Sequence, residues 1–218
     1  MKIDLHVHTS EVSACGKLTV EEVLRLYREH GFDAVVITNH FNRWTADYRA
    51  QRGVPDFVKL YFDVIREGKA LAPKYDMTVL AGCELRFDCN DNDYLVYGVT
   101  EELLRDCETL FALDLSGFAP FAREHDLLIY QAHPFRDRMT VTDPAPLFGI
   151  EVKNGCPRHD SRNDIAEAWA DRFHLRKIAG SDCHRAEDVG QTGIESMDPI
   201  AAEADLVRML KAGRYRIL

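Results

Sequence analysis

Short apolar runs alternate with amphipathic helical patterns along the chain. The length and β-branched content of these runs are typical of buried strands, which we expect over residues 3–7, 34–37, 78–81, 94–97, 127–130, 148–152 and 175–179. Apolar residues at helical spacing predict helices over residues 20–30, 56–69, 109–125, 161–173 and 199–212. This alternation predicts an α/β fold with a parallel sheet and helical crossovers, either open or closed into a barrel.

Local signals sharpen some of the predicted helices. Thr19 and Glu22 have the spacing of a capping box, and Gly31 supplies the stop of the same helix. Asp198-Pro199 opens the last helix. The side chains expected to face the core are Ile165, Ala168, Trp169 and Phe173 in one helix, and Ile200, Ala204, Val207 and Leu210 in the last one.

The composition is that of an ordinary folded protein. Of 218 residues, 46% are hydrophobic and 29% are charged, and no linker or low-complexity segment divides the chain. We therefore expect a single domain over residues 1–218. No apolar run is long enough for a membrane span, and the charged start does not resemble a signal peptide. Six scattered cysteines without a Cys-x-x-Cys pair favour reduced thiols, so we expect a cytoplasmic protein.

The charge balance narrows the possible partners. Asp and Glu number 36 against 27 Lys and Arg, which gives a formal net charge of -9. An acidic surplus argues against broad nucleic-acid binding and leaves short oligonucleotides at most. It does not exclude a small anionic substrate, because bound metal ions invert the local charge. The oligomeric state stays open.

Two histidines lie on one face of the first predicted strand. Because side chains alternate along a strand, His6 and His8 point to one side while Ile3, Leu5 and Val7 point to the other. Two neighbouring imidazoles at the end of a strand make half of a metal site. Taken alone, they fit two hydrogen-bonded histidines equally well.

Residues of the same kind then recur at the ends of further apolar runs. His40 follows the second run, Glu84 the third and His133 the fifth, and Asp182 and His184 follow the last. The carboxyl ends of parallel strands form one face, so we expect all seven side chains to converge. Imidazole and carboxylate ligands suit Zn²⁺, Mn²⁺ or Fe²⁺ better than Ca²⁺. Seven ligands exceed the needs of one tetrahedral ion, which predicts two or three divalent ions.

The ordered motifs resemble those of a known family. Asp4-Leu5-His6-Val7-His8-Thr9, Ile37-Thr38-Asn39-His40, Glu84, His133-Pro134 and Ser181-Asp182-Cys183-His184 look like the motifs of the PHP (polymerase and histidinol phosphatase) superfamily. The resemblance covers nearly the whole chain. It implies a distorted (β/α)7 TIM-like barrel, a metal cluster at the C-terminal ends of the strands, and phosphoester hydrolysis. It also implies one ion held by His6, His8, Glu84 and Asp182, a next one by Glu84 and His133, and a further one by His40 with His184.

Two stretches depart from the pattern of many relatives. A further ligand is expected shortly after the first motif, and either Glu11 or Cys15 can take that role. Three-metal relatives carry another ligand between His133 and Asp182. Here the corresponding strand end carries Asn154, a poor replacement, so the third ion stays an open question.

Metal-activated hydroxide would attack phosphorus without a covalent nucleophile. We assign Asp182, His184 and Arg136 to catalysis, with Arg136 as the first candidate for a phosphate clamp. Weaker candidates for a clamp are Arg43, Lys153 and Arg158. A predicted loop over residues 42–55 carries Trp44 and Tyr48, which offer an aromatic cover for the substrate.

The function favoured by these observations is a metal-dependent phosphoesterase acting on a small-molecule phosphomonoester or a nucleotide-type substrate. One alternative is a metal-binding regulatory or accessory domain without turnover, and another is a phosphodiesterase directed at oligonucleotides. A third alternative is an amidohydrolase, which also begins with His-x-His on a barrel strand. The spacing of Asp182 and His184 fits the phosphoesterase better, because no two strand-end histidines lie between Lys153 and Asp182.

Overall fold

A computed structural model describes all residues from 1 to 218. The strands are β1 (Lys2–Val7), β2 (Ala34–Ile37), β3 (His40–Phe41), β4 (Thr78–Arg86), β5 (Asp93–Tyr97), β6 (Leu128–Gln131), β7 (Gly149–Asn154), β8 (Arg176–Gly180), β9 (Ile194–Ser196) and β10 (Tyr215–Ile217). The helices are α1 (Val20–Glu29), α2 (Arg43–Ala50), α3 (Phe57–Leu71), α4 (Cys107–Phe111), α5 (Leu115–Glu124), α6 (Asn163–Phe173) and α7 (Glu203–Ala212), with two 3-10 turns, η1 (Ala72–Tyr75) and η2 (Ala186–Asp188).

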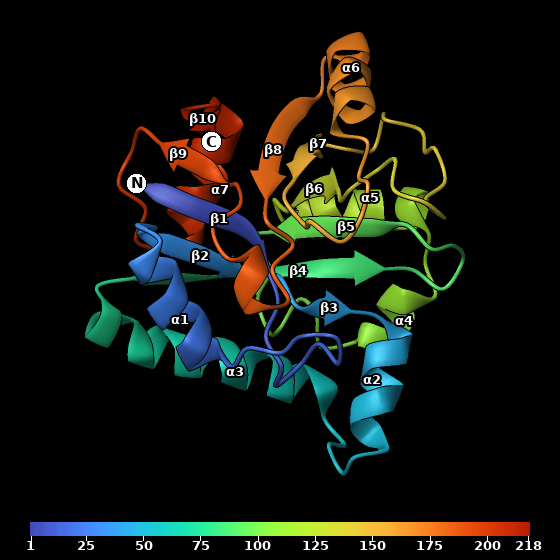
Figure 1. Ribbon diagram of the computed structural model, residues 1–218. Coiled ribbons are helices and arrows are strands. Elements are labelled where there is room, and N and C mark those ends of the chain that lie inside the picture. Colours follow the sequence, from blue (N-terminus) through green and yellow to red (C-terminus); the bar gives the residue numbers. More distant parts are fainter.

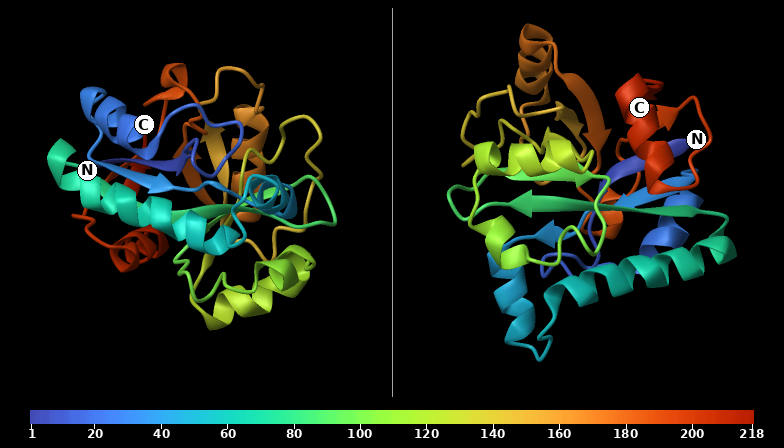
Figure 2. Two further views of the ribbon diagram at one scale, coloured as in Figure 1. Left: turned by 90° about the horizontal axis from the view of Figure 1, so that it is seen from below. Right: turned by 180° about the vertical axis from the view of Figure 1, so that it is seen from behind.

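All ten strands belong to one sheet that curls into a nearly closed barrel (Figure 1). The strand order is β10-β9-β1-β2-β4-β5-β6-β7-β8, and β3 pairs with β4 beside this path. Helices α1 and α3 pack on one side of the barrel, whereas α6 stands on the opposite side (Figure 2). The expected α/β barrel is therefore confirmed.

The barrel closes where β1 meets the segment after β8. His8 N–H donates to the Cys183 carbonyl at 2.9 Å, and Cys183 N–H donates to the His6 carbonyl at 3.2 Å. The buried Asp4 carboxylate reinforces this seam, because its Oδ1 accepts from the N–H groups of both His6 and Ser181 at 3.0 Å. These bonds bring the end of the first strand beside the end of the last barrel strand.

The sheet is mixed, so the prediction of an all-parallel sheet is wrong. β5 runs antiparallel to both β4 and β6. The reason lies in the connection between β4 and β5: only residues 87–92 join them, whereas a parallel crossover needs about a dozen residues or more. β9 and β10 add a further antiparallel pair next to β1.

The helical predictions hold in position but differ in detail. The capping box of α1 is present, with Thr19 N–H bonded to Glu22 Oε2 at 2.8 Å. The helix predicted over 109–125 is two helices, because the Asp114 side chain caps a new start at α5. The predicted loop over 42–55 contains α2, which the Asn42 side chain caps.

Two predicted core faces need correction. In α6, Ile165 and Phe173 are 44% and 39% exposed, and the buried positions are Ala166 and Ala170, whose small side chains let the helix approach the sheet. The last helix begins at Glu203 rather than 199. Ile200 is buried but precedes this helix. Ala168 and Ala204 are exposed, while Val207 and Leu210 are buried as predicted.

Two apolar clusters hold the barrel together. The larger joins α1, α3 and α5 to the sheet, and the smaller joins inward residues of β1 and β2 to α7. None of the helices is both long and apolar enough to cross a lipid bilayer.

Candidate metal centre

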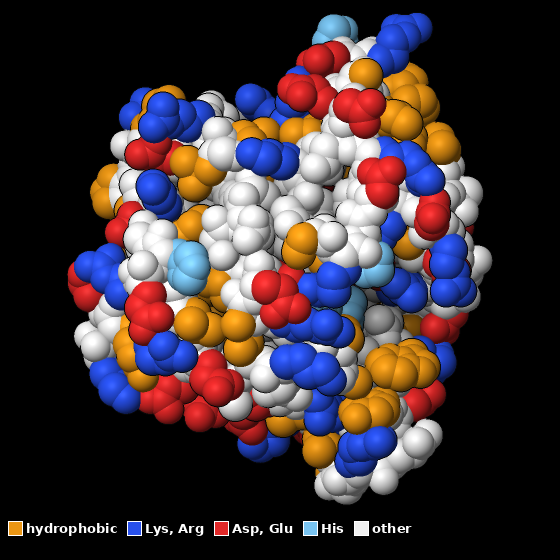
Figure 3. Space-filling model, viewed as in Figure 1, with side chains coloured by type: hydrophobic (Ala, Val, Ile, Leu, Met, Phe, Trp, Pro, Cys, Tyr) orange, Lys and Arg blue, Asp and Glu red, His pale blue; other side chains and the backbone are white.

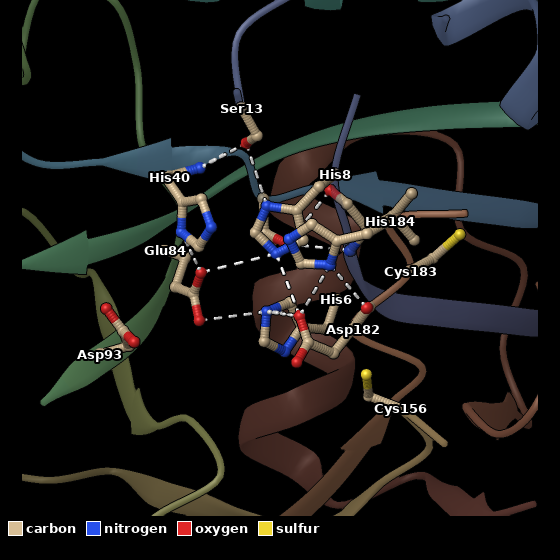
Figure 4. A network of polar contacts seen from close by, with 12 residues as sticks. His6, His8, Ser13, His40, Glu84, Asp93, Cys156, Asp182, Cys183 and His184 are labelled. Carbon is tan, nitrogen blue, oxygen red and sulfur yellow. Dashed lines mark hydrogen bonds and ion pairs between the residues drawn. The ribbon is translucent and has the colours of Figure 1, made fainter. Parts of the chain in front are cut away.

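The structure brings all seven predicted imidazole and carboxylate residues to one end of the barrel. They come from β1 and the residue after it, β3, β4, the turn after β6 and the segment after β8, and Figure 4 shows those it labels pointing toward one another. We call this set the candidate centre: His6, His8, His40, Glu84, His133, Asp182 and His184. Only the His40 and His184 side chains are more than 10% exposed, at 19% and 12%.

The candidate centre divides into three overlapping groups whose ligand atoms lie within 4.8 Å of one another. His6 and His8 each belong to two groups. The groups are His6 with Glu84 and His133, His6 with His8 and Asp182, and His8 with His40 and His184. Shared members place neighbouring groups side by side, as in a cluster of two or three ions.

Several buried polar atoms in the centre have no hydrogen-bond partner in the protein: His6 Nε2, His8 Nε2, His40 Nδ1, His133 Nδ1 and Glu84 Oε2. Buried polar groups are nearly always paired. All of these atoms except His133 Nδ1 face other ligand atoms at short distances without hydrogen-bonding geometry, as His6 Nε2 does at 3.2 Å from Glu84 Oε1. Lone pairs that converge in this way fit a shared cation, and imidazole with carboxylate suits divalent transition metals. The residues present therefore fit metal ions.

Polar groups behind the imidazoles hold their rings and tautomers. Ser13 Oγ donates to Asn39 Oδ1 at 2.9 Å, so at its 3.1 Å contact with His8 Nδ1 it accepts a hydrogen bond from the ring N–H. The same reasoning applies to His184, whose Nδ1 lies 2.9 Å from the Asp182 carbonyl oxygen. In both rings the proton is on Nδ1, which leaves the Nε2 lone pair for a cation.

Glu151 on β7 supports two members of the centre at once. Its Oε1 lies 3.0 Å from His6 Nδ1, and its Oε2 accepts from the N–H of His133 and from Asn154 Nδ2, both at 2.9 Å. The sequence analysis noted this strand end but assigned Glu151 no role. It assigned none to Ser13 either. The contact between Glu151 and His6 spans 145 residues, and no local pattern signals such a pair.

The electrostatics favour the metal-binding forms of His8 and Asp182, whereas neighbouring carboxylates raise the pKa of His6 and His40 against the effect of burial. Burial, together with the neighbouring His184 and His40, lowers the pKa of His8 well below its usual value. Burial alone would raise the pKa of Asp182, but His6 and His8 more than offset it and hold that pKa well below its usual range. A neutral imidazole and an ionised carboxylate are the ligand forms.

Two residues of the centre have left-handed backbones. Asp182 has φ +54° and His133 has φ +27°, conformations that cost about 1–3 kcal/mol for residues other than glycine. Side-chain bonds secure both: Arg136 Nη2 donates to Asp182 Oδ2 at 2.8 Å, and Glu151 accepts from His133 N–H. Strain of this kind collects at functional sites.

The predicted phosphate clamps occupy different places. Arg136 Nη2 bonds Asp182, Asn154 and Ser161, so its guanidinium holds the Asp182 carboxylate in place. Arg158 lies nearby and pairs with Asp188, whereas Arg43 is bound to Asp88 and Glu108. Lys153 bonds the carbonyl of Leu218 and lines neither of the cavities that open onto the centre.

A cavity of about 460 Å³ opens onto the candidate centre. Five arginines line it: Arg86, Arg136, Arg138, Arg158 and Arg185. Arg86, Arg138 and Arg185 were not predicted from the sequence, because nothing in their local pattern sets them apart from solvated loop charges. Figure 3 shows histidine side chains in a hollow edged by Lys and Arg side chains. Four carboxylates line the same cavity, and two of them, Glu84 and Asp182, belong to the candidate centre.

Glu11 and Cys15 belong to none of the three groups, but their positions differ. Glu11 Oε1 accepts from Val20 N–H at 2.9 Å, at the start of α1. Cys15 lines the cavity beside His40 and His184. Partial burial opposes ionisation of the thiol, but hydrogen bonds with these two histidines lower the pKa of Cys15 to about 6.

Comparison with known families identifies the class. The PHP domain model matches residues 4–167, and a PHP-associated model matches residues 160–215. Because the first match covers more than half of the chain, this protein belongs to the PHP domain family. No curated protein matches the chain.

Solved structures share the fold at low sequence identity. A two-domain protein from Bacteroides vulgatus, described as containing a PHP-like metal-dependent phosphoesterase, has a TM-score of 0.68 and 18% identity over 100% of this chain, which spans 64% of that protein. PsfC from Pseudomonas syringae has a TM-score of 0.66 and 18% identity over 99% of this chain and 90% of its own. A sulfate-bound amidohydrolase from Chromobacterium violaceum has a TM-score of 0.60 and 19% identity, with 100% and 98% covered.

Proposed function

We propose that this protein is a metal-dependent phosphoesterase that hydrolyses a small-molecule phosphomonoester or a nucleotide-type substrate. The observation that carries the proposal is the set of three adjoining groups of imidazole and carboxylate ligands, several of whose buried atoms have no partner, beneath an arginine-lined cavity. Two or three ions of Zn²⁺, Mn²⁺ or Fe²⁺ fit the donor set. The net charge of -9 disfavours nucleic-acid partners beyond short oligonucleotides.

The three groups assign the residues that would hold the ions. His6, His8 and Asp182 hold one, His6, Glu84 and His133 another, and the exposed group His8, His40 and His184 a third. When bound, such ions make water a nucleophile near neutral pH and stabilise charge on phosphoryl oxygens.

The remaining work falls to the side chains around the centre. Ser13 and Glu151 keep the rings of His8 and His6 oriented. Arg136 holds the Asp182 carboxylate, so these two side chains lie together where the phosphate would react. His184 lies at the exposed edge of the same site. Arginines on the cavity wall attract the phosphate and neutralise its charge on entry.

Release of 4-nitrophenol from its phosphate mono- and diester, with each of the three metals added in turn, tests the proposal. We expect turnover that a chelator abolishes. His8→Ala and Asp182→Asn should lose both activity and bound metal while keeping the wild-type circular dichroism, whereas His30→Ala, which changes an exposed imidazole on the far end of α1, should keep both. Metal-loaded protein that cleaves neither ester would favour the regulatory, non-catalytic alternative.

A further inference from the structure

A second cavity of about 460 Å³ adjoins the first and differs from it in chemistry. The two cavities share Cys15, His40 and Arg86, so both open onto the exposed side of the candidate centre. The second cavity extends from there to α2 and the β4–β5 connection. Its distinctive wall residues are Trp44, Thr45 and Phe87.

The charges that line the second cavity are balanced. Arg43 and Arg86 face Asp88 and Asp91 on its wall. Arg43 Nε bonds Asp88 at 2.8 Å, and Arg86 Nε bonds Asp93 at 2.7 Å. A wall with as many carboxylates as guanidinium groups does not select a second phosphate. It suits an uncharged group instead.

Trp44 gives this cavity a flat aromatic wall. Its side chain is 63% exposed, although a large aromatic surface in water is unfavourable. The Tyr48 ring braces it in a stack with 5.4 Å between ring centroids and an interplanar angle of 19°, and the Arg52 guanidinium lies 3.5 Å from the Tyr48 ring centroid. The indole is therefore held in place while much of its surface stays open.

We propose that the second cavity binds the leaving group of the substrate, and that this group carries a flat, uncharged ring that stacks on Trp44. The inference rests on the proposed function, because the phosphate must lie at the centre between the two cavities. Hydrolysis breaks the bond from phosphorus to the leaving oxygen, forms a bond from phosphorus to the oxygen of water, and transfers a water proton to the released alcohol. The ring belongs either to a simple aryl ester or to the base of a nucleotide.

Fluorescence tests the stacking without any catalysis. The chain has two tryptophans, so Trp169→Phe leaves Trp44 as the sole tryptophan, which is excited selectively over the tyrosines. Chelator-treated protein carrying this change is titrated with adenosine 5′-monophosphate and with ribose 5-phosphate, which has the same phosphate and sugar but no aromatic base. We expect saturable quenching by the nucleotide only. Equal responses to both ligands would overturn the proposal.

Kinetics of the metal-loaded protein supply the second test. Trp44→Ala should raise KM about tenfold more for a ring-bearing ester than for ribose 5-phosphate, and Trp44→Phe should restore much of the difference. Parallel series with 4-nitrophenyl phosphate and the nucleotide show which ring is preferred. Val141→Ala, which removes another exposed apolar side chain, serves as the control. An unchanged KM ratio in Trp44→Ala contradicts the proposal.

The two proposals fail in different ways. Saturable quenching without hydrolysis of any ester would refute the enzymatic function and keep the ring-binding cavity. Hydrolysis with neither quenching nor a change in the KM ratio would keep the function and refute the cavity's role.

Discussion

The candidate centre has a buried half and an exposed half, and they are built differently. The buried half is His6, His8, Glu84, His133 and Asp182, whose side chains are at most 3% exposed. The exposed half is His40 and His184, to which we add Cys15 because it lines the first cavity beside them. Behind the buried half stands a layer of paired polar groups. The exposed half has solvent on one side.

Because of this difference, we expect the buried half to bind metal tightly and the exposed half to be the side that solvent and substrate reach. Glu151, Ser13 and Arg136 each fix a member of the buried half from behind. Ligands oriented in advance bind a metal more tightly, because less freedom is lost on binding. Solvent reaches the His40 and His184 side chains, which are 19% and 12% exposed. We therefore expect ions in the buried half to be retained and an ion in the exposed half to exchange.

His6→Ala should have the largest effect, because His6 belongs to two of the three groups. We expect hydrolysis to fall to the background rate and most of the bound metal to be lost. Metal analysis and ester hydrolysis measure this. His184→Ala is the matched change in the exposed half and should retain the metal of the buried half. Equal metal loss in both variants would remove the distinction between the halves.

Glu151→Gln should weaken metal binding about 10–100-fold, the usual effect of losing a group that orients a ligand. A Gln side chain has only one acceptor oxygen, so at this position it cannot accept from both the His6 ring and the His133 N–H. A competition titration against a chromophoric chelator measures the dissociation constant. Glu187→Gln, at an exposed carboxylate, is the control. An unchanged constant would show that the layer behind the buried half is dispensable.

Arg136→Ala comes next, with an expected loss of about tenfold in metal affinity. From the sequence, Arg136 is a phosphate clamp and its loss should chiefly raise KM. The contact of Nη2 with Asp182 at 2.8 Å adds an effect on the buried half. Arg138→Ala changes an 82% exposed arginine on the same cavity and should raise KM alone. If Arg136→Ala changes KM and leaves metal affinity intact, Arg136 belongs to the cavity wall rather than to the buried half.

The residues of the centre were predictable because each ends or follows an apolar run. The ends of strands can be recognised from the apolar pattern of a sequence, and the carboxyl ends of parallel strands share one face. The residues behind the centre were not predictable in the same way. Ser13 and Glu151 are ordinary polar residues until the barrel closes and brings them against His8 and His6.

The errors in the fold have a related cause. Helical periodicity shows which residues share a face but not whether another element covers that face, and Ile165 and Phe173 on α6 stay 44% and 39% exposed. The run that became β5 has the apolar content of a parallel strand. Only the short connection over residues 87–92 reveals its antiparallel direction.

Cys15→Ser should have the smallest effect on the centre, a loss of activity of less than about tenfold, because it removes one thiol from the half that solvent reaches. A serine hydroxyl is a much poorer ligand for a transition metal than a thiolate. Metal analysis should therefore show partial loss of metal in the exposed half only.

Glu11→Ala is the matched change, since both residues were candidates for the same ligand position. Its loss should cost about 0.5–1.5 kcal/mol in the free energy of unfolding, measured with urea, because Val20 N–H loses its acceptor, and metal content should stay the same. If Glu11→Ala loses metal and Cys15→Ser does not, the ligand near the first motif is the carboxylate, and the exposed half must be redrawn without the thiol.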